Sequence, residues 1–206
     1  MSKKLHILFL SSWYPSKALS SNGDFVQRHA EAVATRHQVT IIHVVTFAKK
    51  KHIERTSQVI NNVKTIIVYV PKTWNPIYKF WLFLYYYYIE IKKLEKIDIV
   101  HHNVTYPVGI IALWIKIFNN IPYIISEHWS GYQIPQCKSV GFVEKILTKL
   151  VIKHAAFVCP VSKNLEIAMC NMGFKGNYYP IPNVVNTSIF YPEQKQNNLE
   201  FIITHV

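Results

Sequence analysis

The chain has 206 residues, half of them apolar and few of them glycine or proline, which excludes an intrinsically disordered protein and predicts one large domain or one and a half small ones. Lysine and arginine number 23 against 11 acids, so the net charge is +12. This excess favours an anionic partner (nucleic acid, a phosphorylated small molecule or an anionic membrane surface), although a solvated basic surface without a partner has the same charge.

The first 45 residues predict a β-α-β unit. Leu5 to Ser12 is an apolar strand, too short and without the cleavage site of a secretory signal. Asp24 is the expected cap of an amphipathic helix over Phe25 to Arg36, and Val39 to Val45 is the next strand. This order opens a doubly wound sheet.

The next connection predicts a hairpin in place of a helix. Phe47 to Thr56 is a polar, lysine-rich excursion. Gln58 to Ile60 and Val63 to Val70 are the expected strands, because the adjacent Asn61 and Asn62 tolerate the positive φ of a tight turn.

A long aromatic helix follows, capped by Asn75 and running to about Lys96. Its centre, Ile77 to Ile91, is nearly all aromatic or aliphatic but spans only about 22 Å, which is short of a bilayer's hydrocarbon core of about 30 Å. We therefore exclude a transmembrane span. Packing into the core is the expectation for most of the run, and contact of part of it with a membrane interface is the alternative. In that alternative, lipid phosphates meet Lys79, Lys92, Lys93 and Lys96.

The second half of the chain continues the strand and helix alternation. Asp98 to His102 is a short strand, and its adjacent His101 and His102 must face opposite sides, so at most one reaches a crevice of the sheet. A helix over Pro107 to Phe118 follows it.

The remaining elements are a helix, a strand, a second helix and a last short strand. The first helix, Phe142 to His154, carries an expected core-facing stripe. That stripe comprises Phe142, Ile146, Leu150 and Val151. The later elements are strand Ala156 to Val161, a helix from the cap Ser162 to Met172 closed by Gly173, and strand Tyr178 to Ile181.

The composition changes from Pro180 onward, where three prolines, Pro180 included, and several asparagines mark a hinge. We expect a Rossmann-like domain over residues 1–180, a linker over 181–198 and the start of a second, truncated domain over 199–206. The last segment reads as a strand with nothing to pair with, so the chain is expected to be a fragment.

The sequence Ile121 to Tyr132 (IPYIISEHWSGY) is the candidate site. A buried strand ends abruptly in Glu127, His128 and Trp129, at the sheet edge where ligands of parallel sheets bind. An ordinary strand-to-loop turn with a satisfied histidine is the competing interpretation. The site is favoured because acids are rare in this chain and Gly131 would let a ligand come close.

Several kinds of chemistry are excluded by missing motifs. The six glycines form neither a dinucleotide-binding fingerprint nor a P-loop, and only two aspartates are present, which excludes paired-aspartate metal sites. Nothing resembles a nucleic-acid reader motif. The three cysteines (Cys137, Cys159 and Cys170) lack zinc or disulfide spacing and indicate a reducing, cytosolic setting. Gly23, beside a helix N-terminus, remains as a place where a phosphate can approach.

Four stretches together resemble the retaining glycosyltransferases of the GT-B fold, in the large bacterial group usually called family four. They are the opening segment from LHILFLSSWYP through SSNGDFVQRHA to VTIIHV, the ISEHWSGY loop, FVCPVSKNLEIAMCNMGF and the hinge IPNVVNTSIFYP. The resemblance runs from Leu5 to Pro192 and implies one Rossmann-like half of a GT-B enzyme, an α/β three-layer sandwich with a mostly parallel sheet.

The resemblance also implies roles for individual residues. Gly23 matches the position whose backbone meets the donor pyrophosphate, and His128 matches a histidine that lines the sugar site near the reacting centre. The acceptor pocket is assigned to Glu127, Trp129 and Tyr132, and the cleft rim and hinge to Ser162 and Asn183. The family's basic phosphate ligands lie in a second domain.

The expected activity is metal-independent transfer of a sugar from a nucleotide-sugar to a glycan or lipid-linked acceptor with retention, in cell-surface polysaccharide synthesis. The fragment alone is expected to be inactive. No cofactor and no nucleic acid are expected, and the protein should be cytoplasmic, with peripheral contact to an anionic membrane. The alternatives are a GT-B-type sugar-nucleotide epimerase and a non-catalytic ligand-binding module.

Overall fold

The computed structural model describes residues 3–49 and 52–191. Its strands are β1 (His6–Ser11), β2 (Gln38–Thr46), β3 (Glu54–Ile60), β4 (Val63–Val70), β5 (Ile99–Asn103), β6 (Tyr123–Glu127) and β7 (Phe157–Pro160). Its α-helices are α1 (Asp24–Ala34), α2 (Pro76–Lys92), α3 (Gly109–Asn119), α4 (Phe142–His154) and α5 (Lys163–Asn171). Two short 3₁₀ turns, η1 (Ser130–Tyr132) and η2 (Gln136–Ser139), follow β6. The strand expected over residues 199–206 lies outside the described residues.

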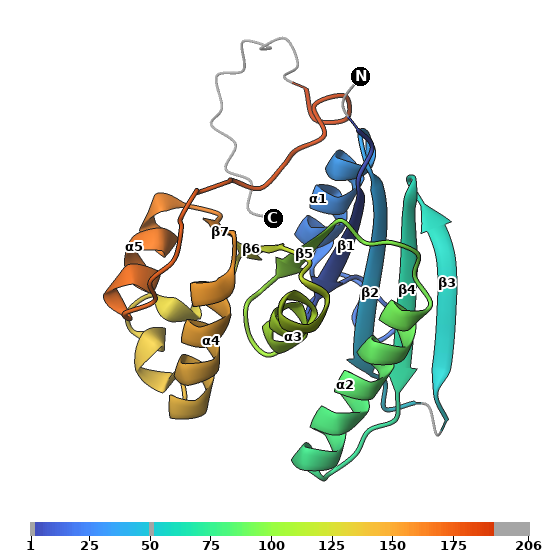
Figure 1. The fold of residues 1–206 in the computed structure, drawn as a ribbon, viewed down its shortest axis with the longest axis horizontal. Helices are drawn as coiled ribbons and strands as arrows, with labels where there is room; N and C mark the ends of the chain where they lie inside the picture. Colours follow the sequence, from blue (N-terminus) through green and yellow to red (C-terminus); the bar gives the residue numbers. More distant parts are fainter. Residues whose placement is uncertain (1–2, 50–51, 192–206) are drawn as a thin grey trace, which may run out of the picture.

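The strands form one seven-stranded sheet in the order β3-β4-β2-β1-β5-β6-β7, parallel throughout except for β3 (Figure 1). The chain proceeds outward from β1 in both directions, first through β2 and later through β5. The topological switch point therefore lies between β1 and β5, and the crevice outside the carboxyl ends of these strands is the expected ligand site of such a sheet.

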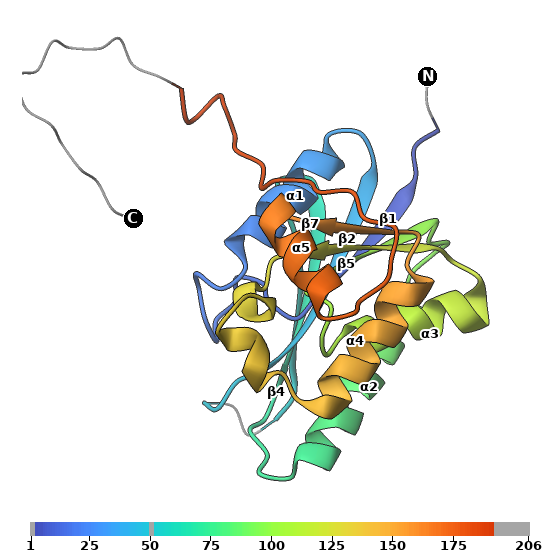
Figure 2. The ribbon, with the colours of Figure 1, turned by 90° about the vertical axis from the view of Figure 1, so that its left-hand side faces the viewer.

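Two cores lie on the two faces of this sheet, as the alternation along β1 shows. Ile7 and Phe9 join the core under α1, whereas Leu8 and Leu10 join the core under α2, α3 and α4. Figure 2 shows α1 on one side of the strands and these three helices on the other. The predicted Rossmann-like three-layer sandwich is confirmed.

The predicted hairpin is also confirmed. Asn61 and Asn62 have φ of 47° and 66° and join antiparallel β3 and β4. Strand β3 begins at Glu54, four residues before the expected strand, so part of the predicted polar excursion is sheet. It is an edge strand that is largely exposed and carries mainly polar side chains.

Helix α2 is capped as predicted, because the Asn75 side chain accepts hydrogen bonds from the backbone of Ile77 and Tyr78, each at 3.0 Å. The expectation that most of its aromatic run packs into the core holds only in part. The half-buried residues packed against the core are Leu82, Phe83, Leu84, Tyr86 and Ile91, and the exposed ones are Ile77, Tyr78, Phe80, Trp81, Tyr85 and Tyr88. Of the aromatic residues of α2, only Tyr87 is buried, and its hydroxyl donates to the Ser11 carbonyl at 3.0 Å. No helix in the described part of the chain is long and apolar enough to cross a membrane.

Two further predictions need correction. On α4 the expected core-facing stripe is mostly exposed at Phe142, Ile146 and Leu150, and the helix buries Val151 together with Ile152. The helix was predicted correctly, but its buried face, formed by Thr148, Val151 and Ile152, lies nearly opposite the face that carries Phe142, Ile146 and Leu150. The expected strand at Tyr178 is an isolated bridge to β7, although residues 177–181 still make three backbone hydrogen bonds of 2.8–3.0 Å with that edge strand.

Candidate functional site

The candidate site is built from the loops that leave the carboxyl ends of β1, β5 and β6. The loop after β1 leads into α1 at Gly23, the loop after β5 contains Thr105, and the loop after β6 begins with His128. Strands β1 and β5 are neighbours, as are β5 and β6, so these three loops meet at one edge of the sheet.

Glu127 ties two of the loops together. Its Oε2 accepts hydrogen bonds from the backbone and hydroxyl of Thr105, at 2.9 and 2.6 Å, and its Oε1 accepts from the backbone of His128 and Trp129, at 2.9 and 2.8 Å. The carboxyl group is fully buried, and burial raises its pKa while these four donors oppose the rise. Glu127 therefore fixes the shape of the site edge, and both of its oxygens are occupied.

The residue before Thr105 adds backbone strain at the same place. Val104 has φ of 62°, in the left-handed region that β-branched side chains rarely adopt. Its amide donates to the Ser126 carbonyl at 3.0 Å, and the next amide donates to Glu127. These hydrogen bonds hold a conformation that costs on the order of 1–3 kcal/mol, as is common at functional sites.

His128 lies in an aromatic cluster formed with α1. Its ring stacks on Phe25 with centroids 4.1 Å apart and meets His29 edge-on at 5.6 Å. Both ring nitrogens are buried, and neither has a hydrogen-bond partner among the described residues. Burial lowers the pKa of His128 to about 3, the neighbouring His29 adds to the decrease, and Asn183 opposes it. The imidazole is therefore neutral near pH 7, with one donor and one acceptor nitrogen, both enclosed by the domain itself.

Gly23 lies two residues before Phe25 and is the cap of α1, with φ of 76°. A Cβ at this position would lie 2.4 Å from the carbonyl oxygen of Trp13, so the tight packing of the β1 loop on the helix start requires glycine. The predicted Asp24 cap is wrong, because Asp24 is the first helical residue and its carboxylate accepts from the amide of Phe25 at 2.9 Å.

Asn183 reaches the cluster from the segment after α5. Its Oδ1 lies 3.3 Å from His29 Nε2, and Ile181 in the same segment donates a backbone hydrogen bond to Pro160 of β7. The expected hinge residue is thus held against α1 by the edge of the sheet.

Of the other predicted site residues, Trp129 and Tyr132 face the interior, whereas Ser162 is exposed. Trp129 is half-buried and meets Tyr132 edge-on at 4.9 Å; Tyr132 is buried, and burial raises its pKa. Gly131 is needed because a Cβ there would lie 2.2 Å from the Trp129 ring. Ser162 caps α5, accepting from the Leu165 amide at 3.2 Å.

The adjacent histidines of β5 face opposite sides, as predicted. His102 Nε2 lies 3.1 Å from the Thr105 carbonyl under α3, whereas His101 packs on Phe9 and its Nε2 lies 2.8 Å from Ser126 Oγ. His101 also lines a cavity of about 600 Å³ beside the cluster. His29 lines this cavity too, but Gly23 and His128 do not.

The sequence did not single out Phe25 and His29 as site residues. Both lie on α1 four residues apart, which places them on one helical face directly after Gly23. An aromatic and an imidazole on the same face of the first helix are the signal that could have identified them.

The profile of a family described as Glycosyltransferase Family 4 matches residues 23–189, which begin at Gly23 and contain His128 and Asn183. The chain belongs to this family. The predicted resemblance to family-four glycosyltransferases is therefore confirmed, and no curated protein matches the sequence directly.

Among solved structures, the family-four chain is similar to sucrose-phosphate synthase from Thermosynechococcus elongatus, with a TM-score of 0.67 and 17% sequence identity. The match covers 92% of this chain and 51% of that one, so the chain spans about half the length of the solved structure it matches. The predicted fold, one Rossmann-like half of a GT-B glycosyltransferase, is confirmed.

Proposed function

We propose that this family-four chain is the acceptor-side half of a glycosyltransferase that moves a sugar from a nucleotide-sugar to a glycan or lipid-linked acceptor with retention, in cell-surface polysaccharide synthesis. The observation that carries the proposal is the family match over residues 23–189. The meeting of the Gly23 loop and His128 at the switch-point edge supports it.

His128 is proposed to hold the transferred sugar near the reacting centre. Its two nitrogens are buried and have no partner among the described residues, so the proposal requires the ring to turn toward the cleft, where they suit a sugar hydroxyl that both donates and accepts a hydrogen bond. Its lowered pKa keeps it neutral, so it positions the sugar without adding charge and without acting as a nucleophile. His29 and Phe25 contact its ring from α1.

Gly23 is proposed to present backbone N–H groups to the donor pyrophosphate at the start of α1, where the helix dipole favours an anion. Asp24 adds a negative charge at the same helix end, so further positive charge must come from the donor side of the cleft. Retention then follows if the acceptor hydroxyl attacks from the face that the nucleoside diphosphate leaves, with no metal or cofactor required.

The acceptor side is assigned to Glu127, Trp129 and Tyr132, and the cleft rim to Ser162 and Asn183. In this arrangement Glu127 acts as a positioning residue, because its oxygens are taken by the loop backbone and Thr105. Residues 1–180 form the acceptor domain and 181–198 the linker in this proposal. The location proposed for the protein is the cytoplasmic face of the membrane.

The test uses the product of the complete gene. Candidate nucleotide-sugars are screened for acceptor-dependent release of nucleoside diphosphate, and NMR of the product determines whether the anomeric configuration is retained. His128→Ala is compared with His154→Ala, which alters an exposed histidine at the end of α4. We expect turnover to fall by at least about tenfold in His128→Ala, the scale of one lost hydrogen bond in the transition state, and to stay near wild type in the control.

Near-normal transfer by His128→Ala would remove this residue from the site. Conversion of a nucleotide-sugar to its epimer without an acceptor would replace the proposal with the epimerase alternative. Turnover of no donor would support the non-catalytic module.

A further inference from the structure

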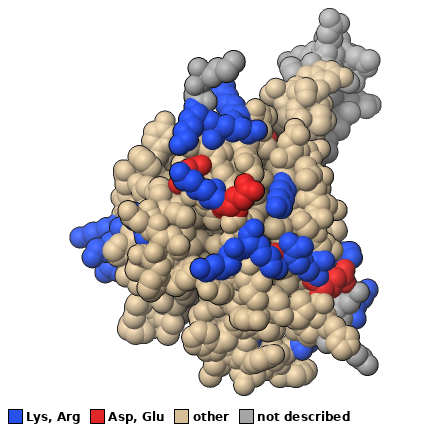
Figure 3. Space-filling view, turned by 45° about the vertical axis from the view of Figure 1, so that its right-hand side comes forward, with Lys and Arg blue, Asp and Glu red and all other residues tan. Residues whose placement is uncertain are grey.

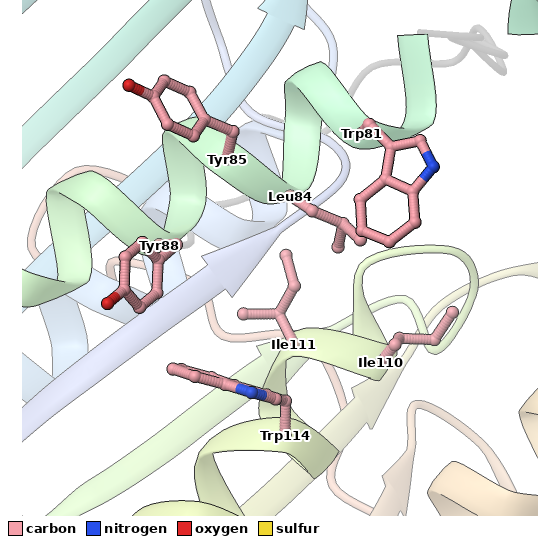
Figure 4. A pocket seen from close by; sticks show the side chains of 7 residues that line it. All are labelled: Trp81, Leu84, Tyr85, Tyr88, Ile110, Ile111 and Trp114. Carbon is pink, nitrogen blue, oxygen red and sulfur yellow. The ribbon is translucent and has the colours of Figure 1, made fainter. Parts of the chain in front are cut away.

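An apolar groove lies between α2 and α3, away from the cluster around His128. It has a volume of about 370 Å³. Figure 4 shows Leu84 and Ile111 facing each other across the space between the helices, with aromatic rings around them. Its lining is entirely aliphatic or aromatic and comprises Trp81, Leu84, Tyr85, Tyr88, Ile110, Ile111 and Trp114.

A second cavity of about 340 Å³ continues this groove toward the candidate site. It shares Leu84 and Ile111 with the first and extends to the start of α2 at Pro76 and to the turn at Tyr106. That turn follows Thr105, which is hydrogen-bonded to Glu127. The groove and the second cavity together form one furrow. This furrow follows α2 from position 76 to position 88, a length of about 18 Å, which is close to the depth of one leaflet of a bilayer's hydrocarbon core.

The helix surfaces around the furrow are also apolar. Trp81 is 63% exposed, Tyr85 is 55% exposed and Phe118 on α3 is 70% exposed. Further exposed apolar side chains on the same two helices are Ile77, Tyr78, Phe80, Tyr88 and Ile117. So much contiguous apolar surface marks an interaction site in a protein of this size, and its richness in Trp and Tyr is typical of side chains at membrane interfaces.

The charges beside the furrow select the partner. The stretches 72–93 and 109–119 contain one acid, Glu90, which is buried and paired with Arg55 at 2.9 Å and Lys93 at 2.6 Å. The amines of Lys79 and Lys92 lie 5.6 and 5.7 Å from the ring centres of Phe83 and Tyr88, so their stems follow the apolar surface and their charges sit at its border. In Figure 3, Lys and Arg form a band with a few Asp and Glu beside it, above a largely uncharged area in the lower part of the view.

This distribution disfavours a second copy of the chain and favours a lipid surface. Two copies meeting through this face would bring lysine against lysine, and the exposed acid beside the two helices, Glu95, lies past the end of α2 among Lys92, Lys93 and Lys96. On an anionic lipid surface, each lysine would instead meet a lipid phosphate, and the acyl chains of the lipids would meet the aromatic rings.

We propose that the α2–α3 face docks on an anionic phospholipid bilayer, with one acyl chain in the furrow and the bordering lysines on lipid phosphates. The proposal rests on the membrane contact included in the proposed function and adds the surface and the ligand. Because the furrow ends at the Tyr106 turn, docking places the Thr105–Glu127 edge of the site beside the headgroups, where a lipid-linked acceptor is presented.

Co-flotation with phosphatidylcholine vesicles, with and without half phosphatidylglycerol, tests the surface. Wild type should bind the anionic vesicles at least about tenfold more tightly, since a few lysines near the surface contribute about 1 kcal/mol each. Tyr85→Glu should weaken binding by at least about tenfold, because it puts a carboxylate among lipid phosphates. The matched control is Tyr179→Glu, which changes a tyrosine of similar exposure (64% against 55% for Tyr85) outside both helices and should bind as wild type.

Quenching of tryptophan fluorescence by lipids with brominated acyl chains tests the furrow itself. The parent for this test is Trp74→Phe, because Trp74 is 90% exposed directly before α2 and would be quenched at the membrane surface. We expect strong quenching in this parent, its loss when Trp81→Phe and Trp114→Phe are added, and its retention when Trp13→Phe and Trp129→Phe are added instead. Vesicle binding without quenching of Trp81 and Trp114 would overturn the insertion of an acyl chain into the furrow and would show contact with the headgroups only. Equal vesicle binding by wild type and Tyr85→Glu would refute the proposal that the α2–α3 face binds the membrane.

The α2–α3 face would instead be a self-association surface if wild type did not bind vesicles and formed a dimer in analytical ultracentrifugation that Tyr85→Glu abolished. Transfer to a soluble acceptor by the complete gene product separates the two proposals. Vesicle binding without transfer would refute the catalytic function, and transfer without vesicle binding would refute only the docking surface.

Discussion

Replacing Glu127 with glutamine tests whether this residue holds the site edge together. A glutamine keeps one oxygen for the amides of His128 and Trp129, but its NH₂ group faces Thr105, whose backbone N–H then has no acceptor. A buried donor without a partner costs about 1–3 kcal/mol, and the remaining hydrogen bonds lose the assistance of the negative charge. Removing a buried charge offsets part of this loss. We expect a net decrease of about 2 kcal/mol in the free energy of unfolding.

The measurement is urea unfolding at pH 7, followed by tryptophan fluorescence and circular dichroism. Thr105→Val should lose about 1–2 kcal/mol, because it removes only the 2.6 Å hydroxyl contact with the carboxylate. Glu95→Gln changes an exposed acid and should stay within about 0.5 kcal/mol of wild type. A Glu127→Gln protein as stable as wild type would show that burial of the charge outweighs its four hydrogen bonds, and would refute the reasoning.

The cap of α1 should tolerate no side chain. Gly23→Ala is expected to lower the free energy of unfolding by at least about 1–2 kcal/mol for the left-handed backbone alone, whereas Gly141→Ala, where a Cβ meets nothing within 4 Å, should lower it by under about 1 kcal/mol. Equal urea midpoints for the two variants would contradict this. Asn75→Ala removes both cap hydrogen bonds of α2 and should lower stability by about 1 kcal/mol, read from the thermal midpoint; an unchanged midpoint would mean that the exposed helix start contributes nothing. Burial lowers the pKa of His43, His101 and His102 to about 4, 3 and 4, so the unfolded chain binds these protons near pH 6.5 and the folded chain does not. The free energy of unfolding should therefore fall as the pH decreases below 6.5, and the limiting slope from these three groups is roughly 4 kcal/mol per pH unit. If urea titrations gave the same free energy of unfolding from pH 6.5 to 5, these histidines would not be buried as neutral imidazoles.

Local features were predictable because the residues that decide them are neighbours in sequence. The Asn61-Asn62 turn and the Asn75 cap each depend on side chains and backbone groups within four residues. The Ser162 cap and the end of α5 at Gly173, with φ of 79°, follow the same rule. The prediction of Asp24 as the cap of α1 was wrong because Gly23, the actual cap, can adopt the left-handed conformation that the close approach of Trp13 requires.

Contact faces were harder to predict than the elements that carry them. Phe142 and Ile146 do share a face of α4, as their spacing indicated, but the apolar Val151 and Ile152 give the helix a second face that can be buried. Periodicity shows which residues lie together and leaves open which set meets the sheet. The same ambiguity made the exposed part of the aromatic run of α2 look like core.

The candidate site was predicted as a location and not as a set of contacts. Gly23, His128 and the switch-point edge followed from strand order and motif. The approach of His29 to Asn183, 154 positions apart in the chain, depends on how α1 and the segment after α5 pack, and no pattern in the sequence reports that distance.

The two borders of the sheet have a consequence for how this protein meets its surroundings. On one side β3 presents polar side chains, and on the other β7 is already hydrogen-bonded to residues 177–181. A foreign strand would meet a polar and partly charged surface at β3, which opposes pairing with its free backbone groups, and an occupied border at β7. Crowding or high concentration should therefore bring copies together through helices and not through strands, giving reversible clusters that detergent disperses in place of amyloid-like fibres.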